Sequence, residues 1–161
     1  MGTRSNTYIL EAFGNDSTVG NIPIVNMYRQ HDGYPSGHGL ALLEFLLPIT
    51  LVNGFGGEPE GLANGAGCLA AQMIGHFKKG VGGFYIQPSD DLRYENDFTY
   101  EVHVSDLSME VKVYEDEKKI FHGTIPEYGT WINEQVRKEA AEWEITKARY
   151  EKERIARESA A

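Results

Sequence analysis

Hydrophobic and polar residues alternate in several short runs of this chain, and this period-two pattern predicts β-strands with one buried face. The clearest run is Phe98–Val104, in which every second residue is aromatic or valine and the residues between them are polar. Turn-forming sequences such as Gly14–Ser17 and Glu115–Lys119 separate these runs. The other predicted strands are Thr7–Phe13, Ile22–Tyr28, Gly83–Gln87, Met109–Tyr114 and Ile120–Ile125.

Three further segments have helical patterns. Leu40–Leu47 predicts a short buried helix that ends at Pro48, and Asn64–Phe77 predicts a second helix with a glycine-rich start. From Thr130 the chain is helical to its end. The sequence therefore predicts the α+β class: an antiparallel sheet of about five strands, two internal helices and one long C-terminal helix.

The predicted C-terminal helix divides the chain into a compact domain, residues 1–129, and a helical segment, residues 130–161. A helix over residues 130–158 would be about 43 Å long, more than the width of a small domain. We therefore expect this segment to project from the domain or to pair with a second copy, which makes a homo-oligomer the expected assembly.

The net charge of −9 is unevenly distributed along the chain. Residues 137–158 hold seven Lys or Arg and six Glu, so that the other 139 residues carry a net charge of −10. An acidic body of this kind argues against nonspecific nucleic-acid binding, which needs a positive surface. Cys68 is the single cysteine, which excludes an internal disulfide and leads us to expect a cytoplasmic protein. The most apolar stretch, residues 40–52, is too short to span a bilayer, and we expect no membrane partner.

The segment Tyr28–Gly39 carries the densest group of polar and turn-forming residues between two apolar runs. It precedes one predicted helix, and Asn64-Gly65-Ala66-Gly67 precedes the other. A helix start exposes unpaired backbone N–H groups, and glycine lets a ligand approach them closely. If the two starts converge, they would hold an anionic group. The predicted ligand-binding residues are Tyr28, Arg29, His31, Asp32, Tyr34, His38, Gly39, Asn64, Gly65 and Gly67.

Within this set, Arg29 would pair with the anion and a tyrosine would stack on a base. The alternative is that the glycines only permit tight turns and close packing. His31, Asp32 and His38 match no recurrent metal motif, so the sequence predicts no metal site and no cofactor. His31 with Asp32 would suit a hydrolase, but no nucleophile in a recognisable setting accompanies them, and we predict no catalytic residue.

The pattern Tyr28-Arg29-x-x-Asp32-Gly33-Tyr34-Pro35-x-Gly37-x-Gly39, followed by Asn64-Gly65-x-Gly67-Cys68-Leu69-Ala70-Ala71, resembles a family of small bacteriophage and prophage proteins of unassigned function. The resemblance covers roughly residues 22–127. It implies a phage accessory protein that acts in the host cytoplasm, of the kind that counters a host defence.

Three functional hypotheses follow from these observations. The first is an accessory protein that binds a small anionic or nucleotide ligand without turnover. The second is an inhibitor that binds a host protein through its acidic surface or its C-terminal helix. The third is a hydrolase that uses His31 and Asp32.

Overall fold

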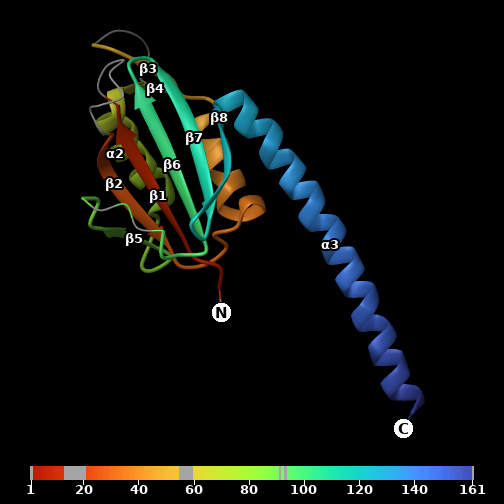
Figure 1. Ribbon diagram of the computed structural model, residues 1–161. Helices are drawn as coiled ribbons and strands as arrows, with labels where there is room; N and C mark the ends of the chain where they lie inside the picture. The colour runs from red at the N-terminus through yellow and green to blue at the C-terminus, as the bar shows by residue number, and fades with distance from the viewer. Residues whose placement is uncertain (1, 13–20, 55–59, 91, 93, 161) are drawn as a thin grey trace.

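The computed structural model of the protein describes residues 2–12, 21–54, 60–90, 92 and 94–160. It confirms the α+β class, with a main sheet of six strands instead of about five (Figure 1). The expected turn Gly14–Ser17 and the last residue of the expected strand Thr7–Phe13 lie outside the described residues. The strands of the main sheet are β1 (Ser5–Glu11), β2 (Ile22–Arg29), β5 (Phe84–Gln87), β6 (Phe98–Ser105), β7 (Ser108–Glu115) and β8 (Lys118–Thr124).

The strand order in this sheet is β5-β2-β1-β6-β7-β8. Neighbouring strands are antiparallel except for β1 and β6, which pair in parallel from Ser5 opposite Phe98 to Glu11 opposite Val104. Two neighbouring parallel strands need a long connection that crosses over one face of the sheet. Here the chain between β2 and β6 supplies that connection, so the N-terminal strand lies in the middle of the sheet.

The connection contains most of the helices. It begins with a π-helical turn, η1 (Pro35–Gly39), and continues through α1 (Leu40–Leu46) and α2 (Gly65–Phe77). A small parallel ladder of β3 (Thr50–Val52) and β4 (Leu62–Asn64) lies between these two helices in the chain. Helices α1 and α2 cover one face of the sheet, and no helix of the described residues lies against the other face, which we call the helix-free face (Figure 1).

The hydrophobic core fills the space between the sheet and the two helices. Ile9, Val102, Val111 and Val113 of the sheet are fully buried there against Leu42, Leu46, Leu69 and Met73 of the helices. Val102, Val111 and Val113 alternate with polar neighbours such as Glu101, His103 and Lys112, which therefore point to the helix-free face. Because this alternation holds on the central strands, the sheet has one apolar face and one polar face.

Helix α3 (Ile125–Ser159) begins five residues before the expected start at Thr130. The reason is a capping box, in which the Thr124 N–H and hydroxyl donate to the Glu127 carboxylate over 2.7 and 2.9 Å, with Pro126 in the first turn. Its first turns belong to the core through Ile125, Tyr128 and Ile132. The 35 residues of α3 span about 52 Å, so that the helix runs far beyond the body.

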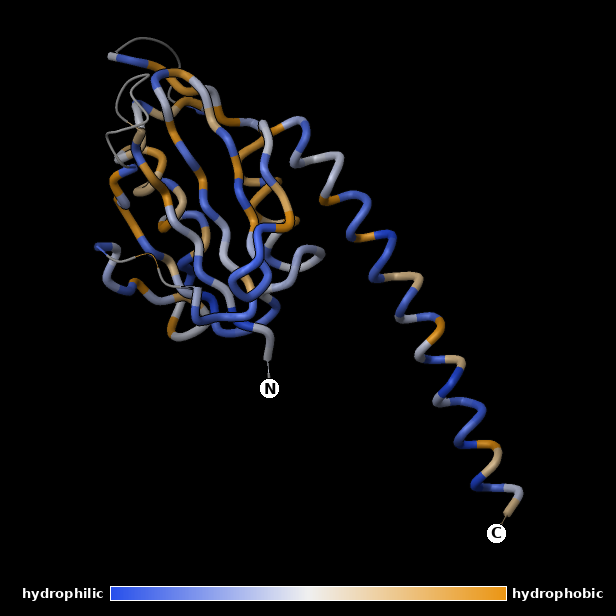
Figure 2. The backbone as a smooth tube through the Cα atoms, in the orientation of Figure 1, coloured by the Kyte–Doolittle hydropathy of each residue, from blue (hydrophilic) through white to orange (hydrophobic). Residues whose placement is uncertain are grey.

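The projecting part of α3 is mostly polar, with isolated apolar residues along it (Figure 2). Trp143 and Tyr150 are 60% and 58% exposed. No helix in the described part of the chain combines the length and the apolar character that crossing a bilayer requires.

Candidate functional site

The structure separates the residues that the sequence analysis assigned to one ligand site. Tyr28 and Arg29 are neighbours in β2, and successive strand residues point to opposite faces of a sheet. Arg29 lies on the helix side, where its guanidinium donates to the His38 ring, whereas Tyr28 packs on the other side beside Tyr85 with ring centroids 6.2 Å apart. One ligand therefore cannot contact the side chains of both residues on the same face.

His38 is fully buried between the sheet and the helices. Its Nε2 lies 2.6 Å from the Thr7 hydroxyl oxygen and its Nδ1 lies 3.2 Å from an Arg29 nitrogen. The rings of Phe77, Phe84 and Tyr100 surround it at centroid distances of 5.3 to 6.0 Å. Burial, reinforced by the positive charge of Arg29, lowers the pKa of His38 to about 3. His38 is thus a neutral core residue.

Arg29 is engaged in the same internal arrangement. Its Nε donates to the His31 carbonyl over 2.6 Å, and its guanidinium carbon lies 5.1 Å from the centre of the Phe84 ring. The predicted pairing of Arg29 with a ligand anion is therefore replaced by bonds within the chain.

The start of η1 already holds an anionic group, the carboxylate of Glu139 from α3. The Ser36 N–H donates to this carboxylate over 3.3 Å, and the Ser36 hydroxyl donates to its other oxygen. The next backbone donors are also used, because His38 N–H bonds to the Asp32 carbonyl and Gly39 N–H to the Tyr34 carbonyl. A glycine-rich helix start does attract a carboxylate here, but the carboxylate belongs to the protein and ties α3 to the body.

Removing this carboxylate should loosen α3 at that point. We expect Glu139→Ala to lower the free energy of unfolding by about 1 kcal/mol, since two hydrogen bonds to a charged, half-buried group are lost. Hydrogen exchange should show faster exchange of the Ser36 N–H. The exposed Glu134→Ala serves as the matched control and should change neither quantity. Equal behaviour of the two variants would contradict this role for Glu139.

The second glycine-rich start lies at the other end of the molecule. Phe77 ends α2 and touches His38, whereas Gly65 begins α2 twelve residues earlier, about 18 Å away along the helix. The two starts therefore do not converge, and the condition for a shared anion site between them is not met. Asn64 does not cap α2, because its side-chain oxygen accepts a hydrogen bond from the Gly54 N–H over 3.2 Å.

The surroundings of the second start also disfavour an anion. A hollow beside Gly65 is lined by the carboxylates of Glu11 and Asp106, which would repel a negatively charged ligand. Gly67 is exposed on α2, with open space where a Cβ would lie.

His31, Asp32 and Tyr34 form the surface turn between β2 and η1. Asp32 adopts a left-handed backbone conformation with φ of 56°, and its carboxylate accepts a bond from the Tyr34 hydroxyl over 3.4 Å. In the described part of the chain no hydrogen bond joins the His31 ring to this carboxylate, and no group of three metal-ligating side chains occurs. Gly39 is packed beneath Ile132 and Tyr100. This turn positions η1, and its described side chains do not point toward a common ligand position.

A different set of polar residues gathers on the helix-free face, on β1, β2, β5 and the segment after β5. Four carboxamides, which we call the amide cluster, bond to one another there: Asn6, Asn26, Gln87 and Asn96. Asn6 donates to Asn26 over 2.6 Å and to Gln87 over 3.0 Å, and it accepts from Asn96. Asn6 is only 2% exposed and Asn26 only 4%. Asparagine is disfavoured in strands, so two buried examples on central strands indicate a specific use.

A buried carboxylate lies beside the amide cluster. Glu101 of β6, opposite Tyr8 in the sheet, accepts hydrogen bonds from the Tyr94 hydroxyl over 2.6 Å and from His103 Nε2 over 2.7 Å. Burial raises the pKa of Glu101, but the bonds from His103 and Tyr94 together lower it by more, so the pKa lies below its usual value. Burial and the neighbouring Glu101 both raise the pKa of the Tyr94 hydroxyl. Glu101 is thus a fixed anion that holds the segment before β6 against the sheet.

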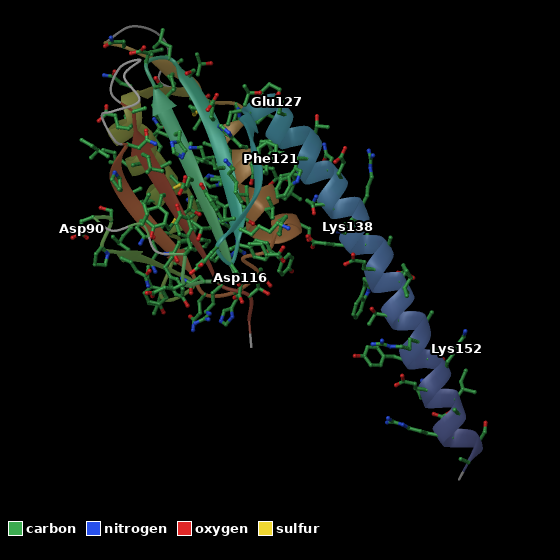
Figure 3. The ribbon with its side chains drawn as sticks, in the orientation of Figure 1. Asp90, Asp116, Phe121, Glu127, Lys138 and Lys152 are labelled. Atoms are coloured by element: carbon green, nitrogen blue, oxygen red, sulfur yellow. The ribbon has the colours of Figure 1, made fainter. Side chains whose placement is uncertain are left out.

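A hollow of about 540 Å³ opens at the amide cluster, within the size range of small-molecule sites. Asp90 lies at its margin, on the side of the body away from α3 (Figure 3). A smaller hollow of about 260 Å³ lies between α2 and β5, but its walls are apolar apart from Lys78 and present no hydrogen-bonding pattern. We therefore place the candidate site in the larger one. Its described lining is Asn6, Tyr8, Asn26, Gln87, Pro88, Asp90, Glu95 and Asn96.

Two amide ends remain available in this hollow. The hydrogen bonds of Asn6 use the Gln87 oxygen and the Asn96 nitrogen, so the Gln87 NH₂ and the Asn96 C=O have no partner among the residues that the structure describes. The result is a donor group and an acceptor group at the rim of one hollow. Such a pair complements the edge of a nucleobase, which also presents a donor next to an acceptor.

This site was not predicted from the sequence, although the alternation of residues contains a signal for it. Asn6, Tyr8, Asn26, Thr99 and Glu101 occupy the polar positions of three strands, a pattern that is also typical of a solvated sheet face. Only the three-dimensional pairing shows that several of these polar positions are buried.

Comparison with protein-family models, with curated proteins and with solved structures finds no match to this chain. The site must therefore be interpreted from its own geometry.

Proposed function

We propose that the protein binds a nucleoside in the hollow of the amide cluster and does not convert it. The observation that carries this proposal is the pair of unused amide ends, the Gln87 NH₂ and the Asn96 C=O, at the rim of a hollow of about 540 Å³. Tyr28 lies on the same face, paired to Asn6 across the sheet, and its ring is 6.2 Å from that of Tyr85, which contacts Lys78 and lines the smaller hollow. Such aromatic rings offer flat surfaces on which a base can stack.

Among the residues that the structure describes, the charged side chains in the lining of the hollow support a neutral ligand over an anionic one. These are Asp90 and Glu95, whose carboxylates would repel a phosphate, and the Asp90 carboxylate can accept a hydrogen bond from a sugar hydroxyl. Arg29, the cation expected to pair with an anion, lies on the other face of the sheet. We therefore propose a ligand that has the base and the sugar of a nucleotide and lacks its phosphate.

The hydrogen bonding and burial of the carboxylate beside the hollow support binding without turnover. The Glu101 carboxylate is held by two hydrogen bonds and is nearly inaccessible. The hydrolase hypothesis has less support, because His31 and Asp32 lie in an exposed turn and do not bond to each other.

Calorimetric titration with adenosine, guanosine, cytidine and uridine, each beside its 5′-monophosphate, tests the proposal. We expect saturable binding of at least one nucleoside, with weaker binding of its monophosphate. Gln87→Glu keeps the oxygen that accepts from Asn6 and removes the outward NH₂, so it should weaken binding more than tenfold.

The matched control is Asn133→Asp, which makes the same amide-to-carboxylate change on the exposed surface of α3. It should bind as the unmodified protein does. Absence of heat with every nucleoside, while circular dichroism shows an intact fold, would contradict the proposal.

The resemblance to phage proteins suggests a purpose for such binding. In that proposal the protein sequesters a nucleoside-type signal of a host defence. A phage-infection assay in a host carrying the defence, with Gln87→Glu beside Asn133→Asp, would show whether the hollow is needed.

The second candidate function is protein binding through α3. It is favoured by the exposure of Trp143 and Tyr150 on the projecting part of the helix. Charged residues of both signs flank this surface, with Glu144 paired to Lys147 at 3.7 Å and Glu151 to Arg154 at 2.6 Å, so a partner would be held mainly by an apolar groove that takes the two aromatic rings. A double variant, Trp143→Ala with Tyr150→Ala, should lose such a partner and keep nucleoside binding.

A further inference from the structure

We propose that the smaller hollow, between α2 and β5, binds a small carboxylic acid with an apolar tail, such as a medium-chain fatty acid. This hollow of about 260 Å³ shares no described lining residue with the hollow of the amide cluster. In this arrangement the tail lies against apolar and aromatic side chains and the carboxylate lies at the one lysine. The described lining is Met27, Ile74, Lys78, Phe84, Tyr85 and Ile86.

The apolar wall of the smaller hollow is held in place by the core. Met27 is 1% exposed, and it pairs with Ile86 across β2 and β5, so that both side chains lie on the helix side of the sheet. The Phe84 ring packs at centroid distances of 5.3 Å from Phe77 and 6.0 Å from His38. Because these groups are already ordered, a ligand would not have to order them on binding.

The outer part of the hollow has apolar surface that a ligand tail could cover. Tyr85 and Ile86 are neighbours in β5 and are 47% and 59% exposed. Adjacent exposed apolar residues beside a hollow are typical of a binding site. A cavity of about 150 Å³ holds one benzene molecule, so in proportion this hollow would hold roughly ten heavy atoms, the size of octanoate.

Lys78 supplies a fixed positive charge at this hollow. Its Nζ donates to the Gly82 carbonyl over 3.0 Å and to the Phe84 carbonyl over 2.7 Å, and it lies 5.2 Å from the centre of the Tyr85 ring. An ammonium group has three N–H donors, so one remains after these two bonds. Among the residues that the structure describes, no carboxylate pairs with Lys78. A ligand carboxylate would therefore meet a cation that is already positioned and not yet neutralised.

The smaller hollow also differs in charge from other hollows of the protein. Three other hollows in the described part of the chain each have at least two carboxylates in their lining: Asp90 and Glu95 at the amide cluster, Glu11 and Asp106 beside Gly65, and Glu115, Glu139 and Glu142 in a hollow of about 240 Å³ beside α3. The described lining of the smaller hollow has a lysine and no carboxylate. On this acidic protein it is therefore a favourable place for an anionic headgroup.

Calorimetric titration at pH 7 with octanoate, hexanoate and octanol tests both parts of the proposed ligand. Octanoate should bind saturably. Hexanoate has two fewer CH₂ groups to bury and should bind about tenfold more weakly. Octanol has the same tail without the charge and should bind about fivefold more weakly than octanoate. Absence of saturable octanoate binding, or equal affinities for octanoate and octanol, would overturn the proposal.

Lys78→Met tests the role of the cation, because methionine keeps an apolar stem and removes the charge. Octanoate binding should fall about fivefold and octanol binding should stay the same. The matched control is Lys79→Met, since the Lys79 Nζ donates to the Gly75 carbonyl over 2.9 Å and Lys79 is not in the described lining. This variant should change neither affinity, and Lys78→Arg should keep the preference for octanoate. An equal loss of octanoate and octanol binding in Lys78→Met would show that Lys78 only shapes the loop before β5, and would overturn the assignment of the carboxylate to it.

Discussion

We expect His38→Ala to lower the free energy of unfolding at pH 7 by about 4 kcal/mol. The substitution removes a fully buried ring from a pocket of three aromatic rings and leaves the Thr7 hydroxyl without its partner at 2.6 Å. It also takes away the acceptor of the Arg29 guanidinium. Chemical denaturation measures this loss, which places His38 among the residues that determine whether the chain folds.

The same residue should make stability depend on pH. The pKa of His38 is about 3 in the folded protein and about 6.5 in the unfolded chain, so the unfolded chain takes up a proton below pH 6.5 and the folded protein does not. The contribution of neutral His38 is therefore complete above pH 6.5 and is lost as the pH falls towards 3. The slope is about 1.4 kcal/mol per pH unit, or about 2 kcal/mol between pH 6.5 and pH 5.

His38→Gln supplies the control, because its amide can still bond to Thr7 and Arg29 but does not titrate. Unfolding curves for this variant should have a shallower pH dependence than those of the unmodified protein, and the other histidines cancel in the comparison. Identical slopes for the two proteins would show that His38 is protonated in the fold.

Gly33→Ala should be similarly damaging, although alanine adds a single methyl group. A Cβ at Gly33 would lie 2.7 Å from the carbonyl carbon of Arg4 and 2.8 Å from the backbone nitrogen of Ser5. These are main-chain atoms at the junction of Arg4 with β1, and they cannot move aside as a flexible side chain would. Gly33 also anchors the turn, since its N–H donates to the Thr3 carbonyl over 2.9 Å and its carbonyl accepts from the Tyr100 hydroxyl over 2.9 Å. We expect a loss of about 3 kcal/mol.

Gly75→Ala is the matched control for this substitution. Gly75 lies inside α2 with open space where a Cβ would be, so alanine there should stabilise the protein by about 0.5 to 1 kcal/mol through its helix propensity. Thermal unfolding should therefore move in opposite directions for the two variants. A stable Gly33→Ala would mean that the turn does not approach β1 as closely as described.

The local elements of the fold could be predicted from the sequence because each depends on nearby residues. Alternation placed the strand Phe98–Val104, and Pro48 placed the end of the first helix within about a residue. The parallel pairing of β1 with β6 could not be predicted, because it joins strands about ninety residues apart and depends on which face the crossover takes. The early start of α3 was predictable in principle, since Thr124, Pro126 and Glu127 form a capping pattern.

The structure does not bring the predicted site residues together, for two physical reasons. Tyr28 and Arg29 are neighbours in the chain, but the strand geometry places them on opposite faces of the sheet. His38 is a polar loop residue, but Phe77 and Phe84 from distant segments bury it. The amide cluster has the opposite property, because Asn6 is 81 residues from Gln87 and 90 residues from Asn96 and meets them only in the folded sheet.

The most direct test of the proposed nucleoside site is a ¹H–¹⁵N correlation spectrum of the protein titrated with the four nucleosides. The side-chain NH₂ signals of Gln87, Asn96 and Asn6 should shift and saturate with one of them, because these amides line the hollow that we assign to the ligand. Shifts confined to the backbone amides of Gly65 and Gly67, or no shift with any nucleoside, would contradict that assignment.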